Sequence, residues 1–511
     1  MKETFFRNTI KWGDIALITA CILETLMFPN TKNLLGCLMT AVSWLIFSRV
    51  FLKKHIILLH PFSFLVFFSM SMYRILPLYA TLLERKPISY KFQNASETFM
   101  LEMLLYIISA LAFYFVVRKK PRNNIITRFL ASFNFYKQPT PAILWFLGAF
   151  GLILSLYFLS AGPVEMGNAM GKFFIVFTLF QYAPLLLLFP ALYSDSDVLY
   201  KKNIKVLVYF FFLIILSFSG NSRAALLEPI GTILLLFVLA FLKVPQQNQK
   251  KGKKIIIGGV LAMVFIMPVL TDVSDAMLLN REIRSDVSSS ELFSRTLNTF
   301  LDKELLARER EERKAFSIGP DNYSEGWTEE YLDNFAFNRY CNMRITDITL
   351  YHAHKIGFNN QEMLDDWFNR ILKTFPTPVL NALNINLDKT DLFSRGDLLY
   401  ALSNKSEIFV GLRVTSHLAD GLATFGYLYF FIQFILFLIE FKLLDCFVFI
   451  KDGRIIYSAY ALICIFDYLG MFRNANGCID EASYLIRGFI QSCFIFIVLY
   501  GVISKFSGKK R

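Results

Sequence analysis

The sequence has little charge and no cysteine or metal-ligand pattern. Charged residues make up 18% of the 511 residues, and the five histidines form no HExxH motif. Soluble domains carry about 25% charged residues, so this shortage argues against an ordinary soluble protein. None of the seven cysteines forms a CxxC pair, which argues against zinc-finger and thioredoxin-like motifs. Cys341 and Cys478 could meet in a disulfide, although the odd total favours two free thiols.

A signal-peptide cleavage site is also missing. Lys2, Arg7 and Lys11 precede the first apolar run, which ends at Phe28-Pro29-Asn30 without the small residues that a signal peptidase requires. We therefore expect the first apolar run to remain as a membrane helix.

What the sequence does contain is a series of long apolar runs. Hydrophobic residues account for 55% of the chain, mostly in runs of about 18–24 residues, which is enough to cross a hydrocarbon core of about 30 Å. The runs are continuous rather than alternating, which favours helices over a membrane β-barrel. We predict an all-α, polytopic helical membrane protein. The twelve predicted spans are 13–28, 33–51, 56–79, 99–117, 141–159, 173–192, 206–218, 224–242, 255–270, 421–441, 455–471 and 484–504.

This pattern divides the chain into three parts: nine spans in 1–270, a hydrophilic loop in 271–420, and three spans with a basic tail in 421–511. Basic residues gather in alternate short loops, and the positive-inside bias places those loops and both termini in the cytoplasm. The long loop is then extracytoplasmic. The positive surplus is an orientation signal, and no basic-aromatic module accompanies it to indicate nucleic-acid binding.

The long loop has the pattern of a folded segment. Residues 297–314 are rich in Leu, Glu and Arg and are predicted to form a helix. Thr328-Glu329-Glu330 has the acidic first turn of a helix N-terminus. Residues 361–373 form a further amphipathic helix, which Pro376 and Pro378 would stop.

Arginines at unusual positions are the candidate ligands for a substrate. Five lie at the predicted outer membrane interface, where positive charge is disfavoured, and a sixth lies on the loop. Arginine binds phosphate through two parallel hydrogen bonds and stays charged when partly desolvated. A ring of such groups would suit a membrane-bound polyanion, although each arginine singly could also extend to lipid headgroups. The six candidates are Arg74, Arg223, Arg344, Arg413, Arg473 and Arg487.

A histidine and an aspartate before the tenth predicted span are the candidate catalytic pair. His417 and Asp420 are three residues apart and would share one face of a helix. They could act as a general base and its orienting carboxylate. The alternative is a polar helix cap, with Thr415 or Ser416 as the N-cap and Asp420 in the first turn.

The arrangement resembles a known family. The short element Ser219-Gly220-Asn221-Ser222-Arg223, the loop segments 339–344 and 367–378, and Ser416-His417 before Gly421 resemble bacterial O-antigen and oligosaccharide repeat-unit polymerases of the Wzy type. The likeness covers nearly the whole chain, chiefly as architecture. The family's loop proline-arginine pair is absent, since Pro376-Thr377-Pro378 stands there instead. O-antigen ligases share the same architecture and an outer-loop histidine.

The resemblance implies a metal-independent glycosyltransferase of the GT-C type in the bacterial inner membrane, with a periplasmic loop and no cofactor. It would move a growing glycan from undecaprenyl diphosphate to the non-reducing end of a new lipid-linked repeat unit. Its partners would be the lipid-linked donor and acceptor, the bilayer and a chain-length regulator protein. The alternatives are an O-antigen ligase, a flippase for lipid-linked oligosaccharide, and a non-catalytic assembly or sensor protein.

Overall fold

The computed structural model divides the chain into two compact units. Unit 1 comprises Met1–Pro121, Ser317–Asp445 and Tyr468–Ser492, and unit 2 comprises Arg122–Phe316, Cys446–Asp467 and Cys493–Arg511. The predicted loop 271–420 therefore contributes to both units. The structure describes residues 2–119, 123–161, 171, 174–219, 223–245, 250–281, 283, 287–316, 322–375, 377–389, 393–472 and 478–507.

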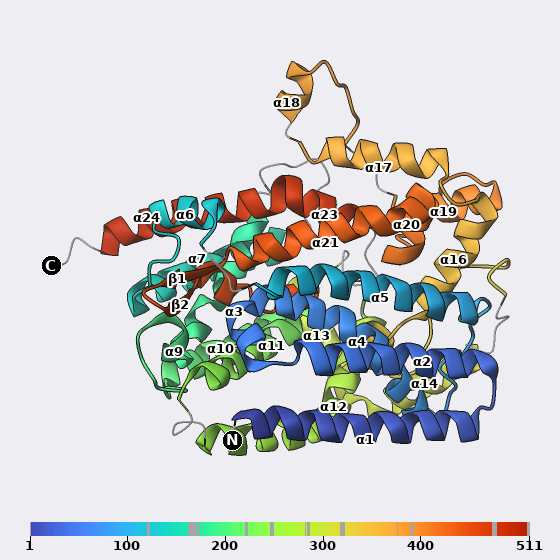
Figure 1. Ribbon diagram of the computed structural model, residues 1–511, viewed down its shortest axis with the longest axis horizontal. Coiled ribbons are helices and arrows are strands. Elements are labelled where there is room, and N and C mark those ends of the chain that lie inside the picture. The colour runs from blue at the N-terminus through green and yellow to red at the C-terminus, as the bar shows by residue number, and fades with distance from the viewer. Residues whose placement is uncertain are drawn as a thin grey trace. The chain divides into compact units, whose positions relative to one another are not determined.

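Unit 1 contains long apolar helices from both ends of the chain. Helix α5 packs against α2 and against α21, and α4 contacts all three of these helices; in Figure 1, α2, α5 and α21 run roughly parallel. The bounds are α1 Lys2–Met27, α2 Thr31–Ile46, η1 Phe47–Phe51, α3 Lys54–Leu59, α4 Pro61–Leu83, α5 Ala95–Val117, α20 His417–Phe425, η5 Gly426–Leu428, α21 Tyr429–Asp445, α23 Ile479–Ser483 and η7 Tyr484–Gly488.

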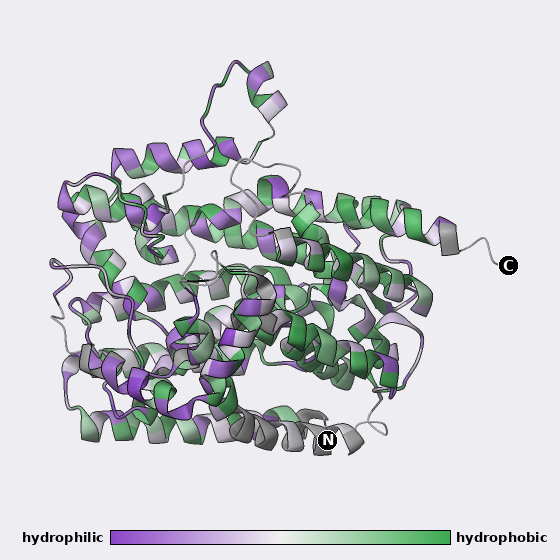
Figure 2. Ribbon diagram, turned by 180° about the vertical axis from the view of Figure 1, so that it is seen from behind, coloured by the Kyte–Doolittle hydropathy of each residue, from purple (hydrophilic) through white to green (hydrophobic). Residues whose placement is uncertain are grey.

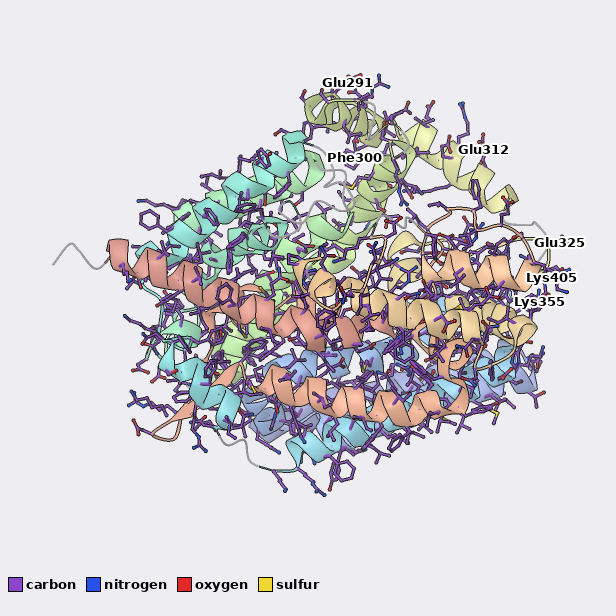
Figure 3. The ribbon with its side chains drawn as sticks, turned by 90° about the horizontal axis from the view of Figure 1, so that it is seen from above. Glu291, Phe300, Glu312, Glu325, Lys355 and Lys405 are labelled. Atoms are coloured by element: carbon purple, nitrogen blue, oxygen red, sulfur yellow. The ribbon has the colours of Figure 1, made fainter. Side chains whose placement is uncertain are left out.

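The hydrophilic part of unit 1 is built from shorter helices, and Figure 2 shows purple and green residues mixed in the hydrophilic segments, against the mostly green long helices. Charged side chains at its surface include Glu325, Lys355 and Lys405 (Figure 3). The helices are α15 Phe335–Tyr340, α16 Arg344–Ile356, α17 Gln361–Lys373, α18 Thr377–Ala382 and α19 Arg395–Asn404.

Two predictions for this segment have opposite outcomes. The predicted helix 361–373 is confirmed as α17, where the side chain of Asn360 caps the first turn. The prediction of a helix beginning at Thr328 is wrong, because residues 326–332 have no regular structure. The carboxylate of Glu329 instead accepts a hydrogen bond from Val414 N–H at 3.0 Å, a long-range contact that no local pattern encodes.

Unit 2 contains the remaining helices and one small hairpin. The predicted helix 297–314 is interrupted at Asp302, which separates α13 from α14. The bounds are α6 Ile125–Ser132, α7 Pro141–Ala161, η2 Val176–Leu188, α9 Pro190–Tyr193, α10 Ile204–Ser219, α11 Arg223–Lys243, α12 Lys250–Leu279, α13 Ser289–Leu301, α14 Lys303–Phe316, β1 Val448–Lys451, β2 Arg454–Tyr457 and α22 Ala459–Ile463; η6 Asp467–Leu469 and α24 Phe489–Ser507 each contain residues of both units.

The hairpin overturns one predicted span. Strands β1 and β2 pair antiparallel with Val448 opposite Tyr457, and Asp452 and Gly453 between them have φ of +49° and +77°. Two left-handed residues make the tight turn that joins antiparallel strands. The predicted helix 455–471 is therefore wrong: this stretch holds β2, the five-residue α22 and a single 3-10 turn.

Within the described residues, seven helices are long and apolar enough to cross a membrane. Each coincides with a predicted span, and two shorter apolar helices, Val176–Leu188 and Ile204–Ser217, match two more. The seven are Thr31–Phe51, Pro61–Leu83, Ala95–Val117, Pro141–Ser160, Leu226–Lys243, His417–Asp445 and Ile479–Lys505. All seven cysteines are free thiols, as the odd total suggested.

Candidate functional site

The apolar stretch that begins at His417 folds back on itself at a glycine. Gly426 follows α20 with φ +57° and ψ −150°, a conformation essentially confined to glycine. His417 and Tyr429 are twelve residues apart, which is about 18 Å in a straight helix, yet Nδ1 of His417 lies 2.5 Å from the Tyr429 hydroxyl. The approach also needs Gly421, since a Cβ there would lie 2.1 Å from the Tyr429 ring. The predicted span 421–441 is thus parts of two helices.

His417 lies at this fold with a partner on each ring nitrogen. Its side chain is 3% exposed, Nε2 pairs with the carboxylate of Glu481, and Nδ1 contacts the Tyr429 hydroxyl. The ring also stacks on Phe437, with centroids 5.9 Å apart. When the carboxylate accepts from Nε2–H, Nδ1 of the neutral ring accepts from the tyrosine hydroxyl. A carboxylate that fixes the tautomer leaves the other nitrogen basic, which is how a general base is prepared.

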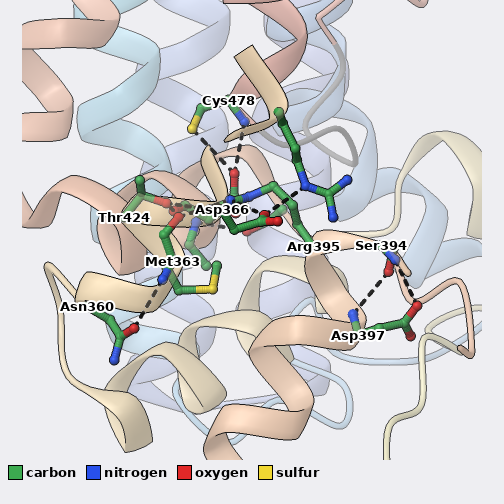
Figure 4. Close-up of polar contacts among 12 residues, drawn as sticks. Asn360, Met363, Asp366, Ser394, Arg395, Asp397, Thr424 and Cys478 are labelled. Carbon is green, nitrogen blue, oxygen red and sulfur yellow. Dashed lines mark hydrogen bonds and ion pairs between the residues drawn. The ribbon is translucent and has the colours of Figure 1, made fainter. Parts of the chain in front are cut away.

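Asp420 pairs with Arg395 and not with His417, which was its predicted partner. Its Oδ1 accepts from Nε of Arg395 at 2.6 Å, and its Oδ2 accepts from the backbone N–H of Cys478 at 3.2 Å and from the thiol at 3.3 Å. Arg395 also donates from Nη1 to Asp366 at 2.8 Å and from Nη2 to Thr424 at 2.6 Å (Figure 4). The carboxylate that orients His417 is therefore Glu481, and Asp420 joins α19, α20 and the segment before α23.

The cap that the sequence offered as an alternative is present as well. Ser416 is the N-cap of α20, and its hydroxyl accepts from Ala419 N–H at 3.0 Å. Asp420 lies in the first turn. His417 is thus the first residue of a capped helix and also the centre of a polar contact network, so the two interpretations describe one arrangement.

Two of the predicted arginines are enclosed within unit 1. Arg74 is buried between spans and donates from Nη2 to Glu102 at 2.7 Å. Arg344 is 1% exposed and donates from Nη1 to the carbonyl of Glu330, while its Nε and Nη2 have no hydrogen-bond partner among the described residues. Its guanidinium lies 5.5 Å from the ring centroid of Tyr323. Neither side chain is open to a bulky ligand in this arrangement.

Arg413 connects the segment before α20 to Asp397 of α19. Its Nη1 donates to Asp397 at 2.8 Å, and its guanidinium lies 4.3 Å from the ring centroid of Tyr400. Burial alone raises the pKa of Asp397, but hydrogen bonds from Ser394 and Arg413 bring that pKa below its ordinary value. The aspartate therefore stays ionised and holds the irregular segment 411–413 before His417, whose backbone N–H groups donate to it.

Arg487 is the predicted arginine that faces an opening. It is exposed on the π-helical turn η7, and its Nε donates to Gln491 at 2.7 Å. It lines an open groove of about 420 Å³ with Thr374, Met471, Phe472, Asp480, Ser483, Tyr484, Gly488 and Gln491. Helix α23 thus presents Asp480 and Ser483 to the groove and Glu481 to His417. π-turns of this kind are frequent at functional sites.

The other two predicted arginines cannot be placed in this site. Arg223 begins α11 of unit 2, but its side chain lies outside the described residues. Arg473 lies outside the described residues altogether. Both remain predictions.

Sequence reasoning missed three residues of the site. Glu481 was placed just outside the predicted span 484–504, although an acid at the start of an apolar run is a signal that could have singled it out. Tyr429 and Arg395 carry no such local signal, because their importance comes from contacts that the fold creates.

In the described part of the chain, no group of three or more His, Cys, Asp or Glu residues is placed to hold a metal ion. Comparison with protein-family models, with curated proteins and with solved structures finds no match. The class comes from the fold: the helices that are long and apolar enough to span a bilayer indicate a multi-pass helical membrane protein. Its candidate site is a buried His–Glu–Tyr cluster beside a groove that carries an arginine.

Proposed function

We propose that the chain is a polymerase of lipid-linked surface polysaccharide. It would transfer a growing glycan from undecaprenyl diphosphate to the non-reducing end of a fresh lipid-linked repeat unit, at the periplasmic face of the bacterial inner membrane. The placement of the N-terminus in the cytoplasm and of the long loop in the periplasm belongs to this proposal. The observation that carries it is the oriented His417–Glu481 pair next to the groove of Arg487.

The chemistry assigned to these residues balances without a further reagent. The acceptor hydroxyl gives its proton to Nδ1 of His417 while its oxygen bonds to the anomeric carbon of the donor. The bond from that carbon to the diphosphate breaks, and undecaprenyl diphosphate leaves with the electron pair. Glu481 stabilises the imidazolium that forms, and Arg487 balances charge on the leaving group, in the way that fixed donors stabilise a transition state.

The burial of His417 imposes a condition on this mechanism. Nδ1 is bonded to the Tyr429 hydroxyl, so the acceptor hydroxyl must displace that contact to reach the base. A displacement of this kind excludes water until the acceptor is in place, which protects the donor from hydrolysis.

A gel of surface glycans tests the proposal. Deletion of the gene should leave lipid A-core capped by single repeat units, and the wild-type gene should restore long chains. His417→Asn should lower chain synthesis by about 10²–10⁴-fold, the usual contribution of a general base. His354→Asn is the matched control, since that histidine is exposed and pairs with Glu97 on the surface.

The other outcomes of the gel identify the alternatives. Uncapped core with accumulated lipid-linked polymer would indicate a ligase, and repeat units trapped on the cytoplasmic leaflet would indicate a flippase. Normal chains in the His417→Asn strain, with the variant present in the membrane, would remove His417 from the reaction.

A further inference from the structure

Helix α6 carries an exposed apolar face. Ile125, Phe129 and Phe133 are spaced four residues apart, and they are 83%, 61% and 50% exposed. Residues at this spacing lie on one side of a helix. With eight residues, α6 is only about 12 Å long, whereas a membrane span must cross about 30 Å. These side chains therefore do not belong to a span, and something other than the middle of the bilayer must cover them.

The remaining circumference of α6 divides into a buried side and a basic side. Thr127 and Leu130 are buried. Arg128 is exposed, and its Nε donates to the carbonyl of Asn123 at 3.2 Å. An exposed apolar side next to a basic one is typical of helices that lie in the plane of the membrane interface, with the apolar side among the first acyl carbons.

The β1–β2 hairpin holds the segment around α6 in place within unit 2. Asn123 forms two hydrogen bonds with Ile450 of β1: its Nδ2 donates to the carbonyl at 2.8 Å, and its Oδ1 accepts from the backbone N–H at 3.0 Å. After the helix, the ring of Tyr136 stacks on Phe449 with centroids 4.9 Å apart, and its hydroxyl donates to the carbonyl of Cys446. The exposed face thus belongs to a fixed structure that joins α6 to the hairpin.

Two neighbouring spans set the depth of this structure in the membrane. The candidate span of α7 begins at Pro141, nine residues after the end of α6. The hydroxyl of Tyr500, in α24, donates to the carbonyls of Lys137 and Gln138 at 3.3 Å. The candidate span that contains Tyr500 ends five residues later, at Lys505. Residues 137–141 therefore lie near the ends of two spans, close to the level of the lipid headgroups.

Basic residues predominate in the segments that form this structure. Residues 123–140 and 446–457 together contain four Lys or Arg residues and one Asp. The arginine of the hairpin also makes an exposed pair with Asp195 at 3.2 Å, and such pairs contribute little. Clusters of basic residues beside a span attract the headgroups of anionic lipids. The four exposed basic residues are Arg128, Lys137, Lys451 and Arg454.

We propose that α6 and the β1–β2 hairpin form a binding site for anionic phospholipids at the membrane surface. The three apolar side chains of α6 insert among the first acyl carbons, and the four basic side chains bind headgroup phosphates. A protein partner would also cover an apolar face, but lipid already surrounds the ends of α7 and α24 at this depth, so lipid is the occupant that needs no further component. The site is independent of the proposed glycosyl transfer.

Quenching of tryptophan fluorescence by brominated lipid tests the position of α6. Wild-type protein and Phe129→Trp, both full-length, are reconstituted into phosphatidylcholine vesicles with brominated acyl chains. The five native tryptophans are present in both proteins, so the difference in fluorescence isolates the introduced one. Bromine near the headgroup end of the chain should quench it most. Ile153→Trp, at an exposed position in the middle of α7, should instead be quenched most by bromine near the chain end.

A second arm tests the choice of headgroup. Phosphatidylglycerol or phosphatidylcholine, brominated one at a time, is added at the same mole fraction, and the phosphatidylglycerol should quench Phe129→Trp more strongly. In this background, Lys451→Gln should weaken the apparent affinity for phosphatidylglycerol by about fivefold, equivalent to about 1 kcal/mol per basic residue at an anionic surface. Salt at about 1 M should weaken it as well, because the screening length falls to about 3 Å. Arg295→Gln, which removes an exposed charge from α13, should have no effect.

Two results would overturn the site. If brominated lipid leaves the tryptophan of Phe129→Trp unquenched, then water or another protein covers α6. If the two lipids quench equally, or if the preference for phosphatidylglycerol survives both Lys451→Gln and high salt, then the basic residues do not select anionic lipid. Lys451 is on the hairpin and not on the helix that carries the introduced tryptophan, so its effect is not a local change at the fluorophore. The vesicles contain no glycan, which keeps these results separate from the polymerase assay.

Discussion

Arg395 and Arg487 are both in unit 1, but they have opposite surroundings. Arg395 is enclosed and bonded to Asp366, Asp420 and Thr424, whereas Arg487 is exposed in a groove with Gln491 as its polar neighbour. Burial lowers the pKa of Arg395, but the charges of Asp420 and its other neighbours raise it above its ordinary value. Arg395 thus stabilises the fold of the site, while Arg487 is exposed and accessible to a ligand.

The largest effect is expected when the enclosed arginine is removed. Arg395→Met should lower the free energy of unfolding by about 3–5 kcal/mol, because Asp420 would stay buried without its cation. Thermal unfolding of the detergent-solubilised protein measures the change. Arg295→Met, which removes an exposed pair with Glu291, should change stability by no more than about 1 kcal/mol. Equal effects of the two variants would contradict the assigned role of Arg395.

His352 extends the comparison to a basic group that is buried without an acid. Its Nδ1 contacts Ser403, and its Nε2 has no hydrogen-bond partner in the described part of the chain. Burial, with the charges of Lys355 and Arg413, lowers the pKa of His352 to about 4. In the unfolded chain the pKa of this histidine is near its ordinary value of about 6.5. As the pH falls from about 6.5 to about 4, the unfolded chain therefore binds a proton that the folded protein does not.

The protein should consequently lose stability over that pH window, by up to about 3 kcal/mol at its acidic end. His352→Gln should remove this part of the acid sensitivity, and unfolding measured at pH 7 and pH 4.5 would show it. His354→Gln, at an exposed position, should leave the pH dependence unchanged. An identical pH profile for wild type and His352→Gln would mean that His352 is not buried in its neutral form.

The smallest effect is expected at the groove. Arg487→Ala should weaken binding of undecaprenyl diphosphate by about tenfold, equivalent to about 1.4 kcal/mol, and should change the free energy of unfolding by no more than about 0.5 kcal/mol. Arg118→Ala, at another exposed arginine of unit 1, is the control for charge alone. Unchanged binding of undecaprenyl diphosphate by Arg487→Ala would contradict the proposed ligand of the groove. Arg487 would then have only a structural role, as Arg395 does.

The comparison also explains which features the sequence could predict. Periodicity is local, so α17 was predicted to the residue, and seven spans follow from apolar runs alone. The Asp452-Gly453 turn was equally local, since this dipeptide is a strong hairpin signal, but the apolar residues after it were interpreted as a span.

The partners in the site depend on contacts that no local pattern contains. Arg395 and Asp420 are 25 residues apart, and His417 and Glu481 are 64 residues apart. Arg74 and Arg487 were both chosen as candidates because of their predicted depth in the membrane. In the structure Arg74 pairs with Glu102, whereas Arg487 lines an open groove. The predicted membrane depth identifies an arginine whose charge is costly there, but only the fold shows whether a carboxylate already pairs with that arginine.

The thiol of Cys478 can be used to detect opening of the candidate site. Burial, together with Asp420, raises the pKa of this thiol well above its ordinary value, and the side chain is nearly inaccessible. An alkylating reagent can therefore react with it only in molecules where the start of α23 has separated from α20. The rate of maleimide labelling at Cys478, followed with and without lipid substrate, would measure that separation without the introduction of a cysteine by mutation.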